Sequence, residues 1–309
     1  MPRPRCRFPS MGALALAGVI PVLSACGDDG LVAPDGPGPP PTPSRIVFES
    51  ERDGNTEIYI MDSDGSNTRR LTQNLAIDEF PDFSPDGRRI VFDSERDGNF
   101  DIFVIDAEGP DIVKLTAHLA PDVQPAWSPD GDRIAFASSR EGSLDIFVMN
   151  SDGTGLLRLT DRPEAERHPV WAPDGTQIAF ESALPFRNVE IFVMRASGTD
   201  AHQVTVGGGD KMWPAWSPDG TQIAYAGLRG SPSGLAVWDI WVMDIGGATL
   251  LNLTDDLARD TGPAWSPDGT QLVFTSTRGA TGSQLFVMNA DGSGVRQLTG
   301  EGARTAAWR

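Results

Sequence analysis

The sequence predicts an all-β protein, a β-propeller of six four-stranded blades. Three observations support this prediction. A tetrapeptide returns at a nearly constant spacing, an apolar pattern around each copy fits short strands, and two incomplete units at the chain ends complete one another. Internal repeats with a period of about 40–45 residues are typical of propellers, in which each repeat forms one blade.

The repeated tetrapeptide is Ser-Pro-Asp-Gly, with alanine replacing the serine once. Its copies begin at positions 84, 128, 172, 217 and 266, so the steps are 44, 44, 45 and 49 residues. Proline presets the second turn position, aspartate accepts backbone hydrogen bonds and glycine adopts the left-handed conformation, so each copy predicts a tight hairpin. An aromatic residue precedes every copy: Phe83, Trp127, Trp171, Trp216 and Trp265.

Four short strands are expected in each unit. The first ends at the aromatic residue, and the second holds an apolar triplet such as Ile134-Ala-Phe136. The third holds a run such as Ile146-Phe-Val-Met149, and the fourth holds a closing Leu159-Thr160 or its equivalent. The third strand is apolar at consecutive positions, which fits a sheet buried on both faces between neighbouring blades. The recurring tryptophans are expected to lie in this interblade core.

The two chain ends supply the sixth unit. Residues 46–72 contain the second, third and fourth strands of a unit but lack the first. Thr305-Ala-Ala-Trp308 matches a first strand with no unit after it, and Trp308 lies 43 residues beyond Trp265. We expect these segments to pair in one blade, because closure of the ring leaves no free sheet edge between the first and last blades.

Residues 1–25 are interpreted as a bacterial lipoprotein signal peptide. Arg3, Arg5 and Arg7 precede an apolar stretch at 11–23 that is too short to span a bilayer comfortably. Leu23-Ser24-Ala25-Cys26 resembles the lipobox, whose cysteine is lipidated and becomes the mature N-terminus. The resemblance implies a lipid anchor at Cys26 and export to the periplasm or cell surface. The alternative is an ordinary cleaved signal with a chance cysteine.

Residues 26–44 are rich in proline and glycine and are interpreted as a tether, partly in polyproline II conformation, before a propeller at 45–309. The chain has 25 Lys and Arg against 43 Asp and Glu, a net charge of −18. Such a protein is expected to repel nucleic acid and anionic headgroups, so only the lipid anchor would bind a membrane. Cys6 is lost with the signal, which leaves no cysteine for a disulfide in the folded domain.

The period of 44 or 45 residues with its Trp-Ser-Pro-Asp-Gly hairpin resembles the WD-like propeller repeat of the TolB-like family. The resemblance covers roughly residues 45–309, essentially all of the chain beyond the tether. It is specific for the fold and weak as a guide to function.

Two recurring polar features are interpreted as structural. Turns such as Asp62-Ser-Asp-Gly65 begin like a calcium loop, but no acid occupies the twelfth position. The arginines are expected to make a shared hydrogen bond to backbone carbonyls, the alternative being a basic ring for an anionic ligand. They recur between the second and third strands, as Arg52, Arg96, Arg140, Arg229 and Arg278.

No catalytic residue, metal site or cofactor is predicted. The three histidines, His118, His168 and His202, fall at different phases of the repeat, and their spacing does not resemble a zinc site.

Function is assigned to the variable loops. One face of the ring should consist of near-identical tight turns, whereas the other carries diverse sequences, and variable residues on a rigid scaffold are where binding usually occurs. Trp213 is interpreted either as an exposed interface residue or as a plug of the channel. The loop Leu228–Trp238 is expected to form a side wall. Six residues are predicted to line the channel mouth and bind the partner: Glu79, Arg167, His168, Lys211, Trp213 and Arg304.

The sequence therefore predicts a non-catalytic, monomeric envelope lipoprotein that binds a protein, peptide or glycan. One alternative is a propeller enzyme, such as a polysaccharide lyase or a hydrolase, with its site at the channel mouth. Another is a scaffold whose partner binds the outer rim.

Replacing Cys26 with alanine tests the anchor. We expect the variant to leave the membrane fraction or to accumulate as an unprocessed precursor, because the thiol that accepts the lipid is gone. Fractionation and N-terminal mass spectrometry measure this. Identical fractionation and an identical N-terminal mass in the variant would show that Cys26 is not the lipidated residue.

Overall fold

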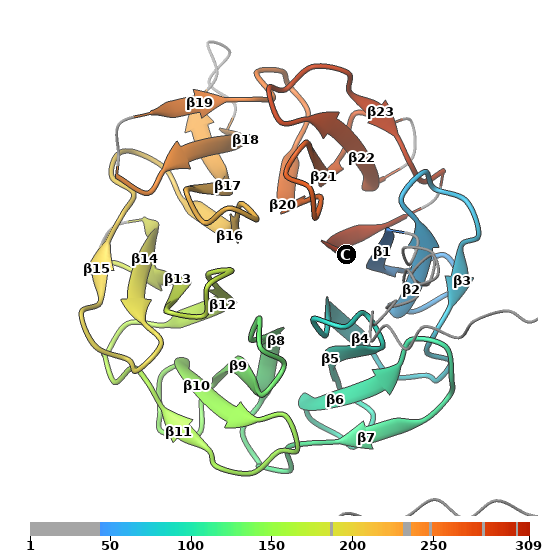
Figure 1. Cartoon of the computed structure of the whole chain (residues 1–309), viewed down its shortest axis with the longest axis vertical. Coiled ribbons are helices and arrows are strands. Elements are labelled where there is room, and N and C mark those ends of the chain that lie inside the picture. Colours follow the sequence, from blue (N-terminus) through green and yellow to red (C-terminus); the bar gives the residue numbers. More distant parts are fainter. Residues whose placement is uncertain (1–43, 186–187, 231–235, 247–248, 280–281, 301) are drawn as a thin grey trace, which may run out of the picture. The chain divides into compact units, whose positions relative to one another are not determined.

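The computed structural model describes residues 44–309 except positions 186–187, 231–235, 247–248, 280–281 and 301. The predicted signal peptide, Cys26 and nearly all of the tether lie outside the described residues. Six antiparallel sheets of four strands surround a central channel (Figure 1). Of the residues described, none belongs to a helix long and apolar enough to cross a membrane.

The second, third and fourth blades are each formed by consecutive strands. The second blade contains β4 (Asp78–Phe83), β5 (Arg89–Ser94), β6 (Asp101–Asp106) and β7 (Ile112–Lys114). The third contains β8 (Asp122–Trp127), β9 (Arg133–Ser138), β10 (Asp145–Asn150) and β11 (Leu157–Arg158). The fourth contains β12 (Glu166–Trp171), β13 (Gln177–Ala183), β14 (Val189–Arg195) and β15 (His202–Gln203).

Two further blades return the chain to its start. The fifth contains β16 (Lys211–Trp216), β17 (Gln222–Gly230), β18 (Ala236–Asp244) and β19 (Leu250–Asn252). The sixth contains β20 (Asp260–Trp265), β21 (Gln271–Ser276), β22 (Gln284–Asn289) and β23 (Arg296–Gln297).

The first blade is built from both ends of the chain, as predicted. Its strands are β24 (Arg304–Trp308), β1 (Arg45–Ser50), β2 (Glu57–Asp62) and β3 (Arg69–Arg70), in that order from the channel outward (Figure 1). β24 pairs antiparallel with β1, with Trp308 opposite Ile46. The Trp308 indole nitrogen also donates a hydrogen bond to Ser44 Oγ at 2.7 Å.

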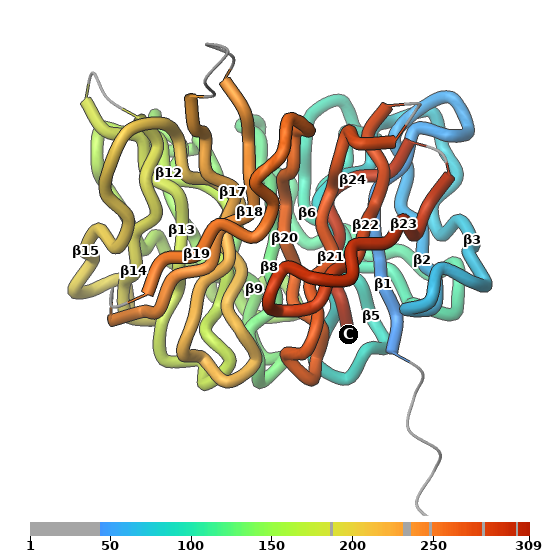
Figure 2. Tube along the Cα trace, turned by 90° about the horizontal axis from the view of Figure 1, so that it is seen from above, coloured from blue at the N-terminus to red at the C-terminus, as the bar shows by residue number. Residues whose placement is uncertain are grey.

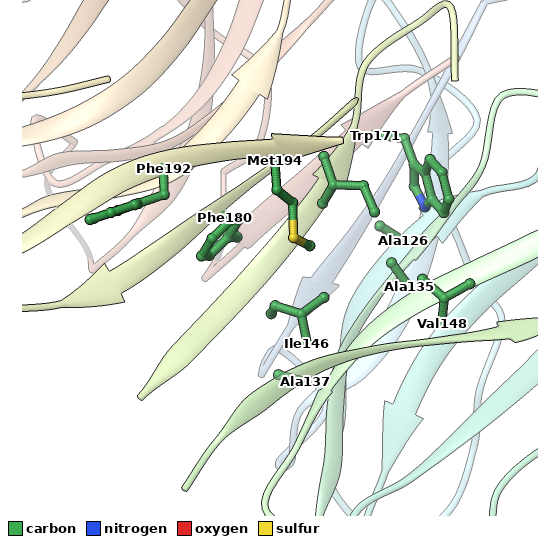
Figure 3. Packing of buried hydrophobic residues seen from close by; sticks show 10 residues of the cluster. Ala126, Ala135, Ala137, Ile146, Val148, Trp171, Phe180, Phe192 and Met194 are labelled. Atoms are coloured by element: carbon green, nitrogen blue, oxygen red, sulfur yellow. The ribbon is translucent and has the colours of Figure 1, made fainter. Parts of the chain in front are cut away.

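The core lies between blades, which confirms the interblade role of the tryptophans. Trp171 of the fourth blade packs in one buried cluster with Ala126, Ile146 and Val148 of the third blade (Figure 3). The Arg133 guanidinium lies 4.5 Å from the centre of the Trp171 ring. Each blade thus buries one face against each neighbour, which explains the continuous apolar runs of the third strands.

The closing Leu-Thr differs from the expectation in one respect. The fourth strand ends before it, as in β11, which stops at Arg158. The buried Thr160 instead accepts the Ile146 backbone N–H on Oγ1 at 2.9 Å. The hydroxyl therefore replaces a ladder partner where the short outer strand has ended. All six blades make this hydrogen bond, through Thr72, Thr116, Thr160, Thr205, Thr254 and Thr299.

The tight turns and the variable loops occupy opposite faces of the ring. The Ser-Pro-Asp-Gly hairpins lie on the face where β24 ends and β1 begins, at the bottom of Figure 2, which we call the turn face. The opposite face is called the loop face. The predicted Leu228–Trp238 loop is in part a strand hairpin, because β17 and β18 continue their pairing to Gly230 and Ala236. Residues 231–235 at its tip are outside the described residues.

Deleting residues 303–309 tests ring closure. The deletion removes β24 and exposes the apolar faces of the first and sixth blades, so we expect a loss of at least about 3 kcal/mol of folding stability, comparable with truncating a buried tryptophan. Thermal and denaturant unfolding measure it. An unchanged melting temperature would mean that the ring does not depend on this strand.

Candidate functional site

The channel is shaped by a β-bulge in every innermost strand. In five of these strands the pairing with the second strand skips two residues, as between Glu79 and Asp82 of β4, and in β24 it skips Thr305 alone. The first skipped residue has a positive φ, between 43° and 58°, and it lines the channel, with a side chain in every blade but the sixth, where it is glycine. The six residues are Phe80, Gln124, His168, Trp213, Gly262 and Thr305.

Five of the six bulges free a backbone N–H that a side chain of the preceding blade accepts, at Phe80, Gln124, His168, Trp213 and Thr305. Gln124 N donates to Asp93 Oδ2 at 2.7 Å, and Trp213 N donates to Glu181 Oε1 at 2.7 Å. In the third blade Ala137 occupies the position that Asp93 and Glu181 have in their blades. The side chain of Gln124, in that same blade, takes over and accepts the His168 N–H on Oε1 at 3.1 Å. The left-handed bulges therefore also fasten neighbouring blades together.

Aromatic side chains close the channel. The rings of Phe80 and His168, from the second and fourth blades, are 5.2 Å apart between centroids. Trp213 lies 5.9 Å from His168 and 5.6 Å from Trp238. The arrangement favours the interpretation of Trp213 as a plug, because the ring is half-buried among other aromatic groups.

Behind the plug a cavity of about 590 Å³ opens toward the turn face. Its wall consists of the innermost strands and the prolines of the Ser-Pro-Asp-Gly turns, such as Pro85 and Pro129. Half-buried Asp82 lines it and accepts the Trp127 N–H at 2.8 Å, and desolvation raises the pKa of Asp82 to about 6.

His168 belongs to the plug and does not stand free at the mouth. Its Nδ1 lies 2.7 Å from Oε1 of the buried Glu181, and its Nε2 lies 2.9 Å from Gln124 Nε2. Lys211 is also internal, with 8% of its surface exposed. Its ammonium donates to the Gly209 carbonyl at 2.7 Å and lies 3.8 Å from Glu190, so Lys211 does not contribute to the loop-face surface.

The other predicted residues do reach the loop face. Arg304 Nε is 2.7 Å from Glu49 Oε1, and its Nη2 is 3.3 Å from Glu79 Oε1, which brings Glu79 and Arg304 together. Arg167 belongs to the fourth blade, across the ring from the first (Figure 1). Its Nε lies 3.9 Å from Glu181 Oε2, and 32% of its side chain is exposed.

Four of the five recurring arginines bind buried carboxylates, whereas backbone carbonyls were expected. Arg229 also donates to the Asp256 carbonyl, and Arg52 donates to Ser50 Oγ. Arg140 Nη2 lies 2.7 Å from Oδ1 of Asp122, which is fully buried, and the guanidinium covers the rings of Phe136 and Phe147. Arg96 binds Asp78 at 3.0 Å in the same way. A buried ion pair of this kind explains why arginine recurs. It also means that these guanidinium groups face the interior and are not free to bind a ligand at the surface.

Exposed aliphatic side chains on the loop face were missed by the sequence reasoning. Leu75 and Leu119 are 99% and 96% exposed, and Leu257 is 74% exposed. Each lies three residues after the buried threonine of its blade, in the loop that leads to the next innermost strand. The sequence did contain a signal for them, namely a leucine three residues after the closing threonine in three otherwise polar loops.

Among the described positions, no group of three or more His, Cys, Asp or Glu side chains is arranged to hold a metal ion.

Comparisons with known proteins agree with this architecture. The profile of the family described as the TolB beta propeller domain matches residues 120–238 and 214–308, more than half of the chain. The profile of the Tricorn protease N-terminal beta propeller domain matches residues 43–144.

Curated relatives match over a short stretch. Over 45 residues the chain is 53% identical to the Tol-Pal system protein TolB of Geobacter sulfurreducens and, over a stretch of equal length, 49% identical to that of Syntrophotalea carbinolica. Each match covers 15% of this chain and only 10% of the relative.

Solved structures extend the likeness to the whole ring. TolB from Acinetobacter baumannii matches with a TM-score of 0.72 at 23% identity, covering 86% of this chain and 66% of that one. An oligogalacturonate lyase in complex with manganese matches with a TM-score of 0.58 at 17% identity, covering 82% and 73%. At such identities these structures support the fold alone.

Substituting Arg140 tests the structural role of the recurring arginines. Arg140→Ala leaves Asp122 buried without its cation, so we expect a loss of about 3–5 kcal/mol. The matched control is Arg195→Ala, because Arg195 forms its pair with Asp200 at the surface, where such pairs contribute at most about 1 kcal/mol. Denaturant unfolding compares the two. Equal small losses would contradict the structural role.

Proposed function

The chain belongs to the TolB beta propeller domain family, and from this premise we propose that it is a non-catalytic binding protein of the bacterial envelope. In this proposal it is exported, anchored by a lipid at Cys26, and holds a protein or peptide partner on its loop face. The names of the curated relatives, which are Tol-Pal system proteins, support a partner in the envelope.

The observation that carries the proposal is the set of protruding leucines on the loop face. Leu75 and Leu119 are almost fully exposed in the loops before β4 and β8, which belong to adjacent blades. Exposed apolar groups on a rigid, otherwise polar surface are typical of interaction sites. On the turn face, by contrast, the loops are near-identical hairpins.

Charge suggests the chemistry of the partner. Glu95, Glu141 and Asp161 in the loops of this face are exposed, and none of them forms an ion pair with another described residue. The arginines of the same loops, such as Arg140, are turned inward to buried carboxylates. The charges that this face presents to solvent are therefore mainly negative. A mainly negative face with exposed leucines favours a partner segment that combines basic and apolar residues.

Variants on the two surfaces test the proposal. Leu75→Asp and Leu119→Asp are expected to weaken capture of the envelope partner by about thirtyfold or more, the effect of losing about 2 kcal/mol of binding energy. The partner is first identified by crosslinking and pull-down from solubilised envelopes with the wild-type protein. Melting temperatures should not change, because both side chains lie at the surface.

The matched control is Val113→Asp on the outer strand β7, where valine is 57% exposed. It introduces the same charge on the rim and should leave capture intact. If Val113→Asp lost capture while the loop-face variants kept it, the partner would bind the outer rim and not the loop face. Trp213→Ala is expected to lower the melting temperature, because Trp213 belongs to the channel plug.

A further inference from the structure

Three carboxylates and one guanidinium meet where the first blade contacts the second. Glu49 lies on β1, Glu79 on β4, Asp93 on β5 and Arg304 on β24. Glu79 is opposite Asp93 in the β4–β5 ladder, and Arg304 is opposite Glu49 in the β24–β1 ladder. Glu49 and Asp93 are buried, whereas 23% of the Glu79 side chain is exposed on the loop side.

The hydrogen bonds within the cluster do not neutralise it. Glu49 accepts the Phe80 N–H at 3.1 Å and the Thr305 hydroxyl at 3.0 Å, in addition to the Arg304 guanidinium. Asp93 Oδ2 accepts the Gln124 N–H, but its Oδ1 is buried and has no hydrogen-bond partner among the described residues. The three acids therefore share one cation.

The surrounding charges add to the negative excess. Glu51 binds the outer side of Arg304 at 2.9 Å. Asp78, beside Glu79 on β4, is paired with Arg96 at 3.0 Å, so that arginine is not available to the cluster. The charged groups that act on Asp93 are Glu79, Glu49 and Asp78, and all three are acidic. Asp101 on β6 and Asp122 on β8 are paired with Lys114 and Arg140.

Burial and mutual repulsion favour the protonated form of these groups. Burial, with Glu49 as the next cause, raises the pKa of Glu79 to about 7. Burial also raises the pKa of Asp93 well above its usual value, with Glu79 and Glu49 adding to the effect. The pKa of Glu49 is raised by burial in spite of Arg304.

We propose that Glu49, Glu79 and Asp93 form a proton-dependent clasp, which retains at least one proton at neutral pH and holds the first and second blades together. When that proton is lost, another negative charge appears between the blades and weakens the contact. The clasp adjoins the blade that closes the ring, so its protonation state affects the whole propeller. This inference does not depend on the identity of the partner.

The direction of the pH effect follows from proton linkage. A carboxyl group with a higher pKa in the folded than in the unfolded chain binds its proton more tightly when folded. Its stabilising contribution is therefore present at acidic pH and is lost as the pH rises through the folded pKa. For Glu79 the window runs from the ordinary value of 4.5 to about 7.

Thermal unfolding of the full-length protein between about pH 5 and pH 8 tests the clasp. The wild-type melting temperature should fall across this range. In Glu79→Gln the fall should be smaller, with the variant about 2–4 °C more stable than wild type at the alkaline end. The matched control is Glu51→Gln, an exposed carboxylate on the same arginine, which should keep the wild-type slope.

Asp93→Asn provides a second variant, since its amide oxygen still accepts the Gln124 N–H. Infrared spectroscopy of the folded protein at neutral pH reports the protonated carboxyl directly, and this band should diminish in Glu79→Gln and in Asp93→Asn. Absence of that band in the wild type would overturn the proposal. A wild-type pH slope retained in both variants would overturn it equally.

Discussion

The antiparallel pairing of β24 with β1 is the interaction on which the ring depends. Each blade buries one face against each neighbour, so a missing innermost strand would expose two apolar faces and an open sheet edge. The chain avoids this by placing its last strand beside its first, with Trp308 opposite Ile46. Because the closing contact joins residues more than 250 positions apart, the first blade and the ring are incomplete until the last strand has joined the first.

Polar contacts inside the ring complement the apolar core. Twelve Asp and Glu side chains are buried among the residues that the structure describes. Asp122 binds an arginine, Glu181 accepts a bulge N–H from the next blade, and Asp93 does the same with one oxygen. Burying charge is costly unless it is paired or hydrogen-bonded. Glu181 and Asp93 therefore link neighbouring blades, whereas the pair of Asp122 lies within its own blade. Because many of these acids are paired with arginine or lysine, such as Asp78 with Arg96 and Asp122 with Arg140, they contribute little to the net charge of −18.

The aromatic plug separates the two ends of the channel and gives the faces different chemistry. Phe80, His168 and Trp213 meet across the axis, and the cavity behind them is lined largely by proline and tryptophan. The loop face carries exposed leucines and carboxylates on blades that each pack against two neighbouring blades. A partner on that face would meet groups that are already positioned, which lowers the entropy lost on binding.

The repeat by itself determined the number of blades, the hairpins and the sharing of one blade by both termini, because these follow from local turn chemistry and a regular period. Sequence also placed the tryptophans in the core and separated a uniform face from a variable one. It predicted the candidate site less well. Glu79 and Arg304 lie together on the loop side, a pairing that the sequence did not predict, whereas Lys211 is buried and Trp213 belongs to the plug.

Only the tertiary structure decided which charged side chains face solvent. Arg140 and Lys211 resemble surface residues in the sequence, yet each turns inward because a buried carboxylate lies within reach on another strand. Leu75 and Leu119 resemble core residues, yet they protrude because their loops pass over the face after the outer strand has ended. The fate of such side chains depends on neighbours that are distant in the chain, and local sequence carries no record of those neighbours.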